Sequence, residues 1–168
     1  MASSDTLKLP TLLRSQIVKD EEAVMRGNCI HEAMSSVITR DTASEAVHHF
    51  YRTTSDDYRA LFSEDELQAR IAHYLENEKA KGWFERDVNV INEQTILLPN
   101  DDEHRRPDRV IVSPDGTATV IDYKTGKPEN KHQIQVAAYG KRLREMGFDR
   151  VKASLWYLES NEIVTVWE

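Results

Sequence analysis

Residues 106–124 read RPDRVIVSPDGTATVIDYK, and this stretch predicts two β-strands joined by a tight turn. Val110 to Val112 and Thr117 to Ile121 are rich in the β-branched residues that favour strands. Between them, Pro114 and Asp115 suit the centre of a type I turn, and Gly116 suits the left-handed position that follows it. We therefore expect a hairpin with a three-residue loop and a bulge.

The register of this hairpin decides where its charged side chains lie. A three-residue loop pairs Ser113 with Thr117 and, further along the strands, Asp108 with Asp122 on one face of the sheet. A two-residue loop would place the two aspartates on opposite faces, and the turn residues argue against it. Lys124 shares the face of Asp122 because side chains alternate along a strand, whereas Tyr123 points the other way.

Two carboxylates on neighbouring strands are the oxygen ligands that Mg²⁺ or Mn²⁺ prefers. Such a cation can activate a water molecule and neutralise charge on a phosphate, and a lysine such as Lys124 can stabilise the transition state. His31, on a helix predicted earlier in the chain, could complete the ligand shell, since imidazole is acceptable to Mn²⁺. Glu93, in the strand predicted before the hairpin, stays open as a further acid.

The rest of the chain predicts an α/β fold, with a mixed central β-sheet flanked by helices and a helical N-terminal half. We expect one domain over residues 1–168, in which 1–19 form an N-terminal arm, 20–82 are mainly helical and 83–168 form the sheet core. The predicted helices cover 20–38, the residues after Thr42, 63–81 and 130–146. The predicted strands cover 88–98, 110–112, 117–121, 151–158 and 163–167. The helix at 130–146 is expected to act as a crossover between two strands.

Three of these helices carry N-cap signals in the sequence. Asp20 is a candidate cap of the first helix, and the segments beginning at Thr42 and Ser63 both match the capping-box pattern. Gly27, inside the first helix, costs helix stability, so we expect it to permit the close approach of another backbone or a ligand next to His31.

Composition narrows the function classes. The net charge of −7 argues against a free-standing, high-affinity nucleic-acid binder, although three local basic patches are possible. Their members are Arg105, Arg106 and Arg109; Lys124, Lys127 and Lys131; and Lys141, Arg142 and Arg144. The single cysteine, Cys29, excludes an internal disulfide and a cysteine-ligated metal centre. No apolar run has membrane-spanning length and no signal region is apparent, so we expect a soluble, cytoplasmic protein.

The motifs together resemble those of the PD-(D/E)XK nucleases of the RecB/AddA type, which are modules of helicase–nucleases. Gly27-x-x-x-His31 resembles the helical motif of that family, and Pro107-Asp108 resembles its "PD" strand. The segment 122–126, DYKTG, resembles the catalytic core, and Gln135-x-x-x-Tyr139 resembles the helix that follows it in this branch. The AddB-type relatives carry iron–sulfur cysteines that this chain lacks, which places it nearer the RecB/AddA side.

The resemblance implies a restriction-endonuclease-like core and a role for each matching residue. His31, Asp108 and Asp122 would be metal ligands together with the Tyr123 carbonyl, and Asp108, Asp122 and Lys124 would be catalytic. Gln135 and Tyr139 would support the site or contact the DNA backbone.

The function expected from the sequence is a Mg²⁺- or Mn²⁺-dependent deoxyribonuclease, the exonuclease module of a helicase–nuclease in DNA repair and recombination. Its partners would be DNA, with single-stranded ends favoured by the family resemblance, and a helicase domain or subunit. Two alternatives stay open, namely a DNA-binding or scaffolding domain that does not cleave, and a nuclease that acts on RNA or on structured junctions.

Overall fold

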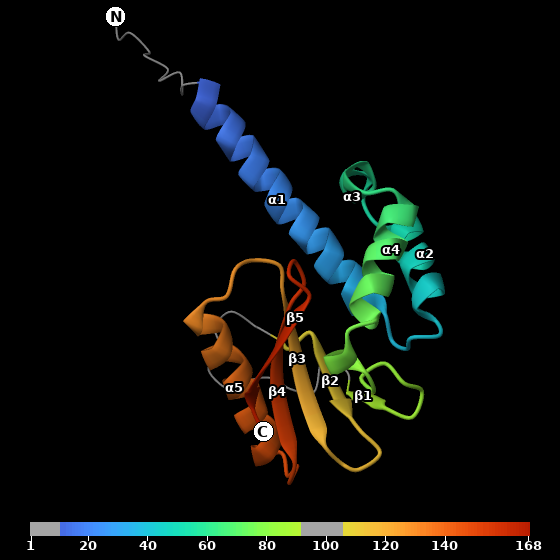
Figure 1. Cartoon of the computed structure of the whole chain (residues 1–168), viewed down its shortest axis with the longest axis vertical. Coiled ribbons are helices and arrows are strands. Elements are labelled where there is room, and N and C mark those ends of the chain that lie inside the picture. Colours follow the sequence, from blue (N-terminus) through green and yellow to red (C-terminus); the bar gives the residue numbers. More distant parts are fainter. Residues whose placement is uncertain (1–10, 92–105) are drawn as a thin grey trace, which may run out of the picture.

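A computed structural model describes residues 11–91 and 106–168, and its centre is a five-stranded mixed sheet in the order β1-β2-β3-β4-β5 (Figure 1). The strands β3 and β4 are parallel, and all other neighbours in the sheet are antiparallel. The strands are β1 (Asn89–Ile91), β2 (Arg109–Val112), β3 (Ala118–Lys124), β4 (Val151–Tyr157) and β5 (Glu162–Trp167). The helices are α1 (Thr11–Ser36), α2 (Ala43–Thr53), α3 (Asp56–Leu61), α4 (Glu64–Leu75), the 3₁₀ turn η1 (Glu78–Ala80) and α5 (Asn130–Glu145).

Helices cover both faces of the sheet, and each face has its own apolar core. On one face, Ile121, Tyr123 and Trp156 pack with buried residues of α1, α2 and α4. On the other face, Val120 and Leu155 pack with buried residues of α5. The period of two along β3 therefore sends alternate side chains into different cores, which confirms the predicted α/β fold with a mixed sheet and flanking helices.

The hairpin has the predicted register. Arg109 pairs with Ile121 and Val110 with Val120, so the extension of these strands sets Asp108 beside Asp122. The backbone N–H of Ser113 donates to the Thr117 carbonyl at 3.0 Å. Gly116 has a φ of +82°, the left-handed conformation that was expected of it.

The α5 crossover joins the parallel strands β3 and β4, as predicted. It lies so close to the sheet that a Cβ added at Gly140 would be 2.5 Å from Trp167 Cε3. The glycine therefore sets how near the C-terminal half of the helix comes to β5.

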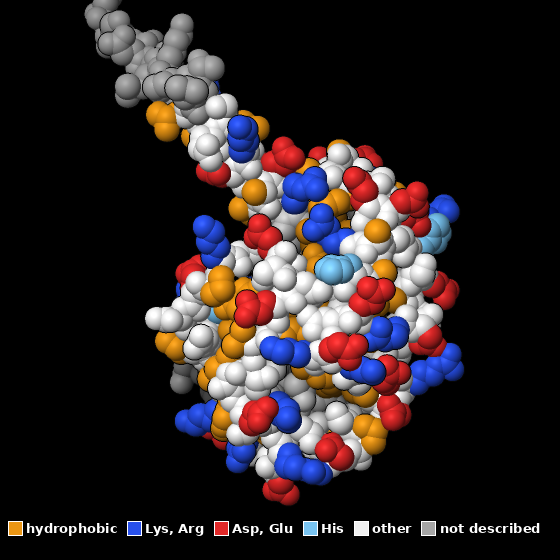
Figure 2. Space-filling view, viewed as in Figure 1, with side chains coloured by type: hydrophobic (Ala, Val, Ile, Leu, Met, Phe, Trp, Pro, Cys, Tyr) orange, Lys and Arg blue, Asp and Glu red, His pale blue; other side chains and the backbone are white. Residues whose placement is uncertain are grey.

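The first helix is longer at its start than predicted. It begins at Thr11 rather than Asp20 because residues 11–19 contain no glycine or proline to interrupt it. Asp20 accepts a hydrogen bond from Gln16 Nε2 at 2.9 Å within the helix and is not a cap. The helix ends at Ser36 rather than Ile38, and its N-terminal part projects away from the body of the molecule (Figures 1 and 2).

The two predicted capping boxes differ in outcome. At Ser63 both reciprocal hydrogen bonds with Glu66 are present, which confirms the prediction. At Thr42 the prediction is wrong, because its hydroxyl lies 2.7 Å from Thr39 Oγ1 and makes no cap hydrogen bond. The helix after Ser63 was predicted to reach Lys81, but it ends at Leu75. Shortly after that end, the Asn77 side chain donates to the Asn161 carbonyl and accepts from the backbone N–H of Lys79.

The strand predicted from Val88 to Leu98 is described only at its start, where β1 lies. The single cysteine, Cys29, is buried. The remainder of that strand, including Glu93, and the basic residue Arg105 lie outside the described residues. Within the described ranges, no helix is long and apolar enough to cross a membrane.

Candidate functional site

The candidate site lies where β3 ends, between α1 on one side and α5 on the other. Asp122 and Lys124 point toward the α5 face, and Asp122 is only 3% exposed. Lys124 Nζ lies 2.5 Å from Asp122 Oδ2, although no hydrogen bond of ordinary geometry reaches that oxygen within the described residues. A buried carboxylate oxygen thus faces the site with only an ionic neighbour.

Asp108 joins the hairpin to α1. Its Oδ2 accepts a hydrogen bond from the backbone N–H of Tyr123 at 2.6 Å, and its Oδ1 lies 2.8 Å from His31 Nε2. One carboxylate is therefore held by β3 and by the helix at the same time. The structure brings together His31, Asp108, Asp122 and Lys124 from three separate parts of the chain.

Gly27 explains how α1 can lie so close to the strand end. A Cβ at this position would be 2.7 Å from Thr125 Oγ1, and Thr125 directly follows Lys124. The expected close approach is thus present, although it is made by a side chain and not by a backbone. Gly27 is one turn before His31, so the same contact positions the histidine.

Exchanging Gly27 for alanine tests this close contact. We expect Gly27→Ala to lower the free energy of unfolding by about 1–3 kcal/mol, because overpacking outweighs the gain in helix propensity of about 1 kcal/mol. Chemical denaturation measures the change. Thr125→Ala in the same protein should recover part of the loss, because it removes the nearest atom, Oγ1.

The control for that experiment is Gly126→Ala, since an added Cβ there would meet nothing within 4 Å. Equal stabilities of the Gly27→Ala and Gly126→Ala variants would show that the contact between α1 and the strand end is not tight.

The charges at the site are mutually dependent. Burial and, to a smaller extent, repulsion from Asp108 together raise the pKa of Asp122 to about 6, while Lys124 opposes the shift. The hydrogen bond to Asp108 raises the pKa of His31 above its usual value, in spite of partial burial. A positive charge added between Asp108 and Asp122 would reduce the repulsion between their carboxylates.

Lys124 is also restrained from the α5 side. Its Nζ donates to Gln135 Oε1 at 3.0 Å, and Gln135 Nε2 donates to the Tyr139 hydroxyl at 3.4 Å. Tyr139 is fully buried, so this chain of contacts ties the lysine to the packed interior of α5. Of the two predicted supporting residues, Gln135 therefore contacts the lysine directly, and Tyr139 contacts Gln135.

A family model described as "PD-(D/E)XK nuclease superfamily" matches residues 5–166. The chain belongs to this superfamily. No curated protein matches the chain closely enough to add a named relative. Membership in the superfamily implies a hydrolase that acts on nucleic acids, and superfamily members generally use divalent metal ions.

The side chains at the strand end fit such an ion in chemistry. Within the described residues, no three His, Cys, Asp or Glu side chains already form a cation site. However, the buried Asp122 Oδ2 has only the Lys124 ammonium group beside it, and Asp108 and Asp122 repel one another. Carboxylate oxygens of this kind suit a hard cation, which would compete with Lys124 for Asp122 Oδ2.

Two residues at this end of the sheet have roles that the sequence analysis missed. Arg109 was assigned to a surface basic patch, which is wrong, because it is 5% exposed and donates to three backbone carbonyls. His132 is also buried, and its Nδ1 lies 3.4 Å from the Tyr157 hydroxyl. Tyr157 is the β4 partner of Lys124, so only the strand pairing, and no motif, could have located His132 here.

Proposed function

We propose that the chain is a metal-dependent DNA nuclease that hydrolyses phosphodiester bonds, with Asp108, Asp122 and Lys124 as its catalytic residues. The observation that carries the proposal is the convergence of these three side chains at the end of the β2–β3 hairpin. We assign the metal to Asp108 and Asp122, with His31 and the Tyr123 carbonyl as further ligands. Mg²⁺ or Mn²⁺ suits this set of donors.

Each residue of the site has a distinct task in this proposal. Asp108 and Asp122 would hold the cation, which would supply charge neutralisation and would make water at the site more acidic. Lys124 donates to the phosphate oxygen on which negative charge develops, or orients the attacking water. Gln135, in contact with Lys124 Nζ, holds that ammonium group in place, and Tyr139 holds Gln135.

We further propose that the domain acts within a RecB/AddA-like helicase–nuclease in DNA repair and recombination, as its exonuclease module. The DYKTG segment followed by Gln135 and Tyr139 supports this branch. The chain has a net charge of −7, and on the face shown in Figure 2 acidic and basic side chains are interspersed. Such a surface suits a module to which a partner delivers the DNA.

The test is cleavage of linear DNA, single-stranded and duplex, in Mn²⁺ or Mg²⁺. We expect cleavage of both single-stranded and duplex DNA to stop when EDTA removes the metal. We expect Lys124→Gln to slow cleavage by about 100-fold or more, because the variant lacks a positive charge that stabilises the transition state. Lys81→Gln, which changes an exposed lysine elsewhere, is the control and should cleave normally.

The outcomes separate the proposal from its alternatives. Unchanged cleavage by the Lys124→Gln variant would refute the assigned site. DNA binding without turnover would favour a scaffolding domain, and cleavage of RNA but not DNA would favour the other substrate class.

A further inference from the structure

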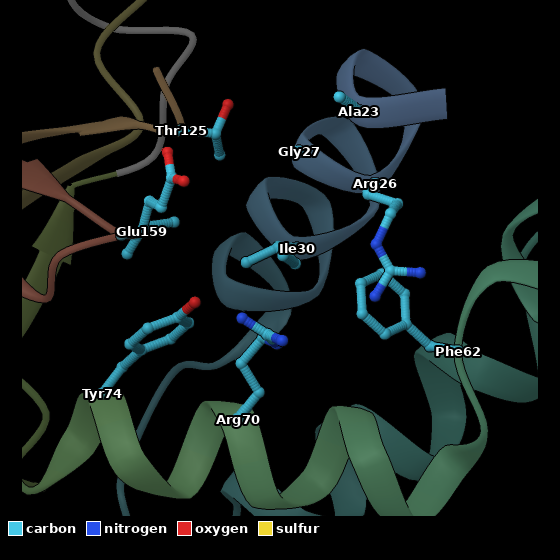
Figure 3. Close-up of a pocket in the computed structure, with 10 residues that line it drawn as sticks. Ala23, Arg26, Gly27, Ile30, Phe62, Arg70, Tyr74, Thr125 and Glu159 are labelled. Carbon is cyan, nitrogen blue, oxygen red and sulfur yellow. The ribbon is translucent and has the colours of Figure 1, made fainter. Parts of the chain in front are cut away.

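A hollow of about 260 Å³ lies beside the contact between Gly27 and Thr125, and both residues line it (Figure 3). Its walls come from α1, α4, the residue after β3 and the turn after β4. Since Thr125 follows Lys124 and Gly27 precedes His31 by one helical turn, the hollow adjoins the candidate active site.

Two arginines converge on this hollow around one aromatic ring. Arg26 lies over the Phe62 ring at 4.1 Å, and Arg70 lies 5.6 Å from the same ring. Figure 3 shows Arg26 stacked on the ring while Arg70 reaches up from α4 toward α1. Arg26 is further fixed by a hydrogen bond from its Nη1 to the Leu61 carbonyl at 2.8 Å. Stacked guanidinium groups keep their N–H donors free at the edge, which suits a phosphate.

A buried hydroxyl group also points to a ligand. Tyr74 is 2% exposed, and its hydroxyl makes no hydrogen bond of ordinary geometry within the described residues. Burial raises the Tyr74 pKa, and the neighbouring Arg70 side chain, which interacts with the hydroxyl, opposes that rise. The hydroxyl and the Arg70 guanidinium therefore lie together at the hollow, where both could donate to one anion.

A second hollow, of about 390 Å³, shares Arg26, Phe62 and Arg70 with the first and extends along α4 toward His73. Its one acidic residue, Glu66, is held in the capping box by Ser63 and interacts electrostatically with Arg26 and Arg70, so it offsets part of their positive charge. The arginines thus line two adjoining hollows at once.

We propose that Arg26 and Arg70 bind a backbone phosphodiester of the substrate strand next to the one that is cleaved. The inference rests on the proposed function and assigns to it a positioning subsite for the strand. Two charged donors and one hydroxyl match the anionic oxygens of a phosphate and carry no information about base sequence. Glu159, exposed in the turn after β4, lines the same hollow and opposes the binding of an anion.

The test measures binding of a 5′-hydroxyl single-stranded DNA oligonucleotide to the full chain in EDTA, by fluorescence anisotropy at several KCl concentrations. We expect Arg70→Gln to weaken binding about fivefold and to reduce the slope of log K against log salt by about 0.7, because one phosphate contact is lost. Arg150→Gln removes one charge at the opposite end of the sheet, near the hairpin turn, and should leave binding unchanged.

Glu159→Gln provides a test of opposite sign that does not depend on the stability of the Arg70 variant. We expect it to tighten binding about twofold, because a repelling charge is removed. Equal binding by the Arg70→Gln and Arg150→Gln proteins, or no tightening by Glu159→Gln, would overturn the subsite.

The two proposals fail in distinguishable ways. If the wild-type chain cleaves DNA but the Arg70→Gln and Arg150→Gln variants bind DNA equally well, the proposed function is supported and the proposed subsite is refuted. If the wild-type chain does not cleave DNA but its DNA binding depends on Arg70 as described, the proposed function is refuted and the proposed subsite is supported.

Discussion

Asp122→Asn is expected to reduce the rate of DNA cleavage by about 1,000-fold or more and, at the same time, to stabilise the metal-free fold. The activity falls because an amide cannot replace a carboxylate as a ligand of a hard cation or balance its charge. The fold gains because Asp122 is buried next to Asp108, which raises its pKa to about 6. The neutral amide removes the cost of keeping a charge there.

The sign of the stability effect depends on pH. Because the folded-state pKa of Asp122, about 6, lies above its usual value of 3.8, the destabilisation of the wild-type protein by this group grows as the pH rises from about 4 to about 6 and stays at its full size above that. Below about pH 4 the group is protonated in both folded and unfolded states, and the cost disappears. We therefore expect Asp122→Asn to add about 2 kcal/mol to the free energy of unfolding at pH 8 and almost nothing at pH 4.

Urea denaturation in EDTA at the two pH values measures this difference, with Asp149→Asn, at an exposed aspartate, as the control. Added Mn²⁺ should stabilise the wild-type protein but not the Asp122→Asn variant, since a ligand stabilises only the state that binds it. A variant that is less stable than wild type at pH 8 without metal would show that Asp122 is not held under repulsion.

The hairpin could be predicted because its determinants are local. The Ser113-to-Gly116 turn fixes the loop length, loop length fixes the register, and the register places Asp108 beside Asp122. The same holds for Ser63, whose cap depends on a residue only three positions away. Spacing along the helix likewise placed Gln135 and Tyr139 on one face.

The features that the sequence did not reveal depend on contacts between distant segments. The end of α4 is set by Asn77, which bonds to a residue 84 positions later. The hollow beside Thr125 combines α1 with α4, and no single-sequence pattern reports such a pairing.

Arg109 is the clearest case of such a contact, and replacing it should cost more stability than any other single change considered above. Its guanidinium donates to the carbonyls of Val37 at 2.9 Å, Ile38 at 2.7 Å and Trp83 at 3.0 Å, and its Cζ lies 4.1 Å from the centre of the Phe84 ring. We expect Arg109→Met to lower the free energy of unfolding by about 3–5 kcal/mol, because buried carbonyls lose charged donors.

Arg109→Lys should cost about 2 kcal/mol, since one ammonium group keeps the charge but cannot span three carbonyls. Arg106→Met, at an exposed neighbour from the same predicted basic patch, should stay within about 0.5 kcal/mol of wild type. Chemical denaturation at pH 7 distinguishes the three variants, and similar losses for Arg106 and Arg109 would contradict the buried role.

The position of Arg109 connects this stability effect to the site. It directly follows Asp108 in the chain, and two of the three carbonyls it binds, those of Val37 and Ile38, come just after the end of α1, the helix that carries His31. The same side chain therefore fixes the distance between the histidine and the carboxylate that it contacts at 2.8 Å. For this reason the Arg109→Lys protein, still folded, should also show a weaker stabilisation by Mn²⁺ than wild type, whereas Arg106→Met should not.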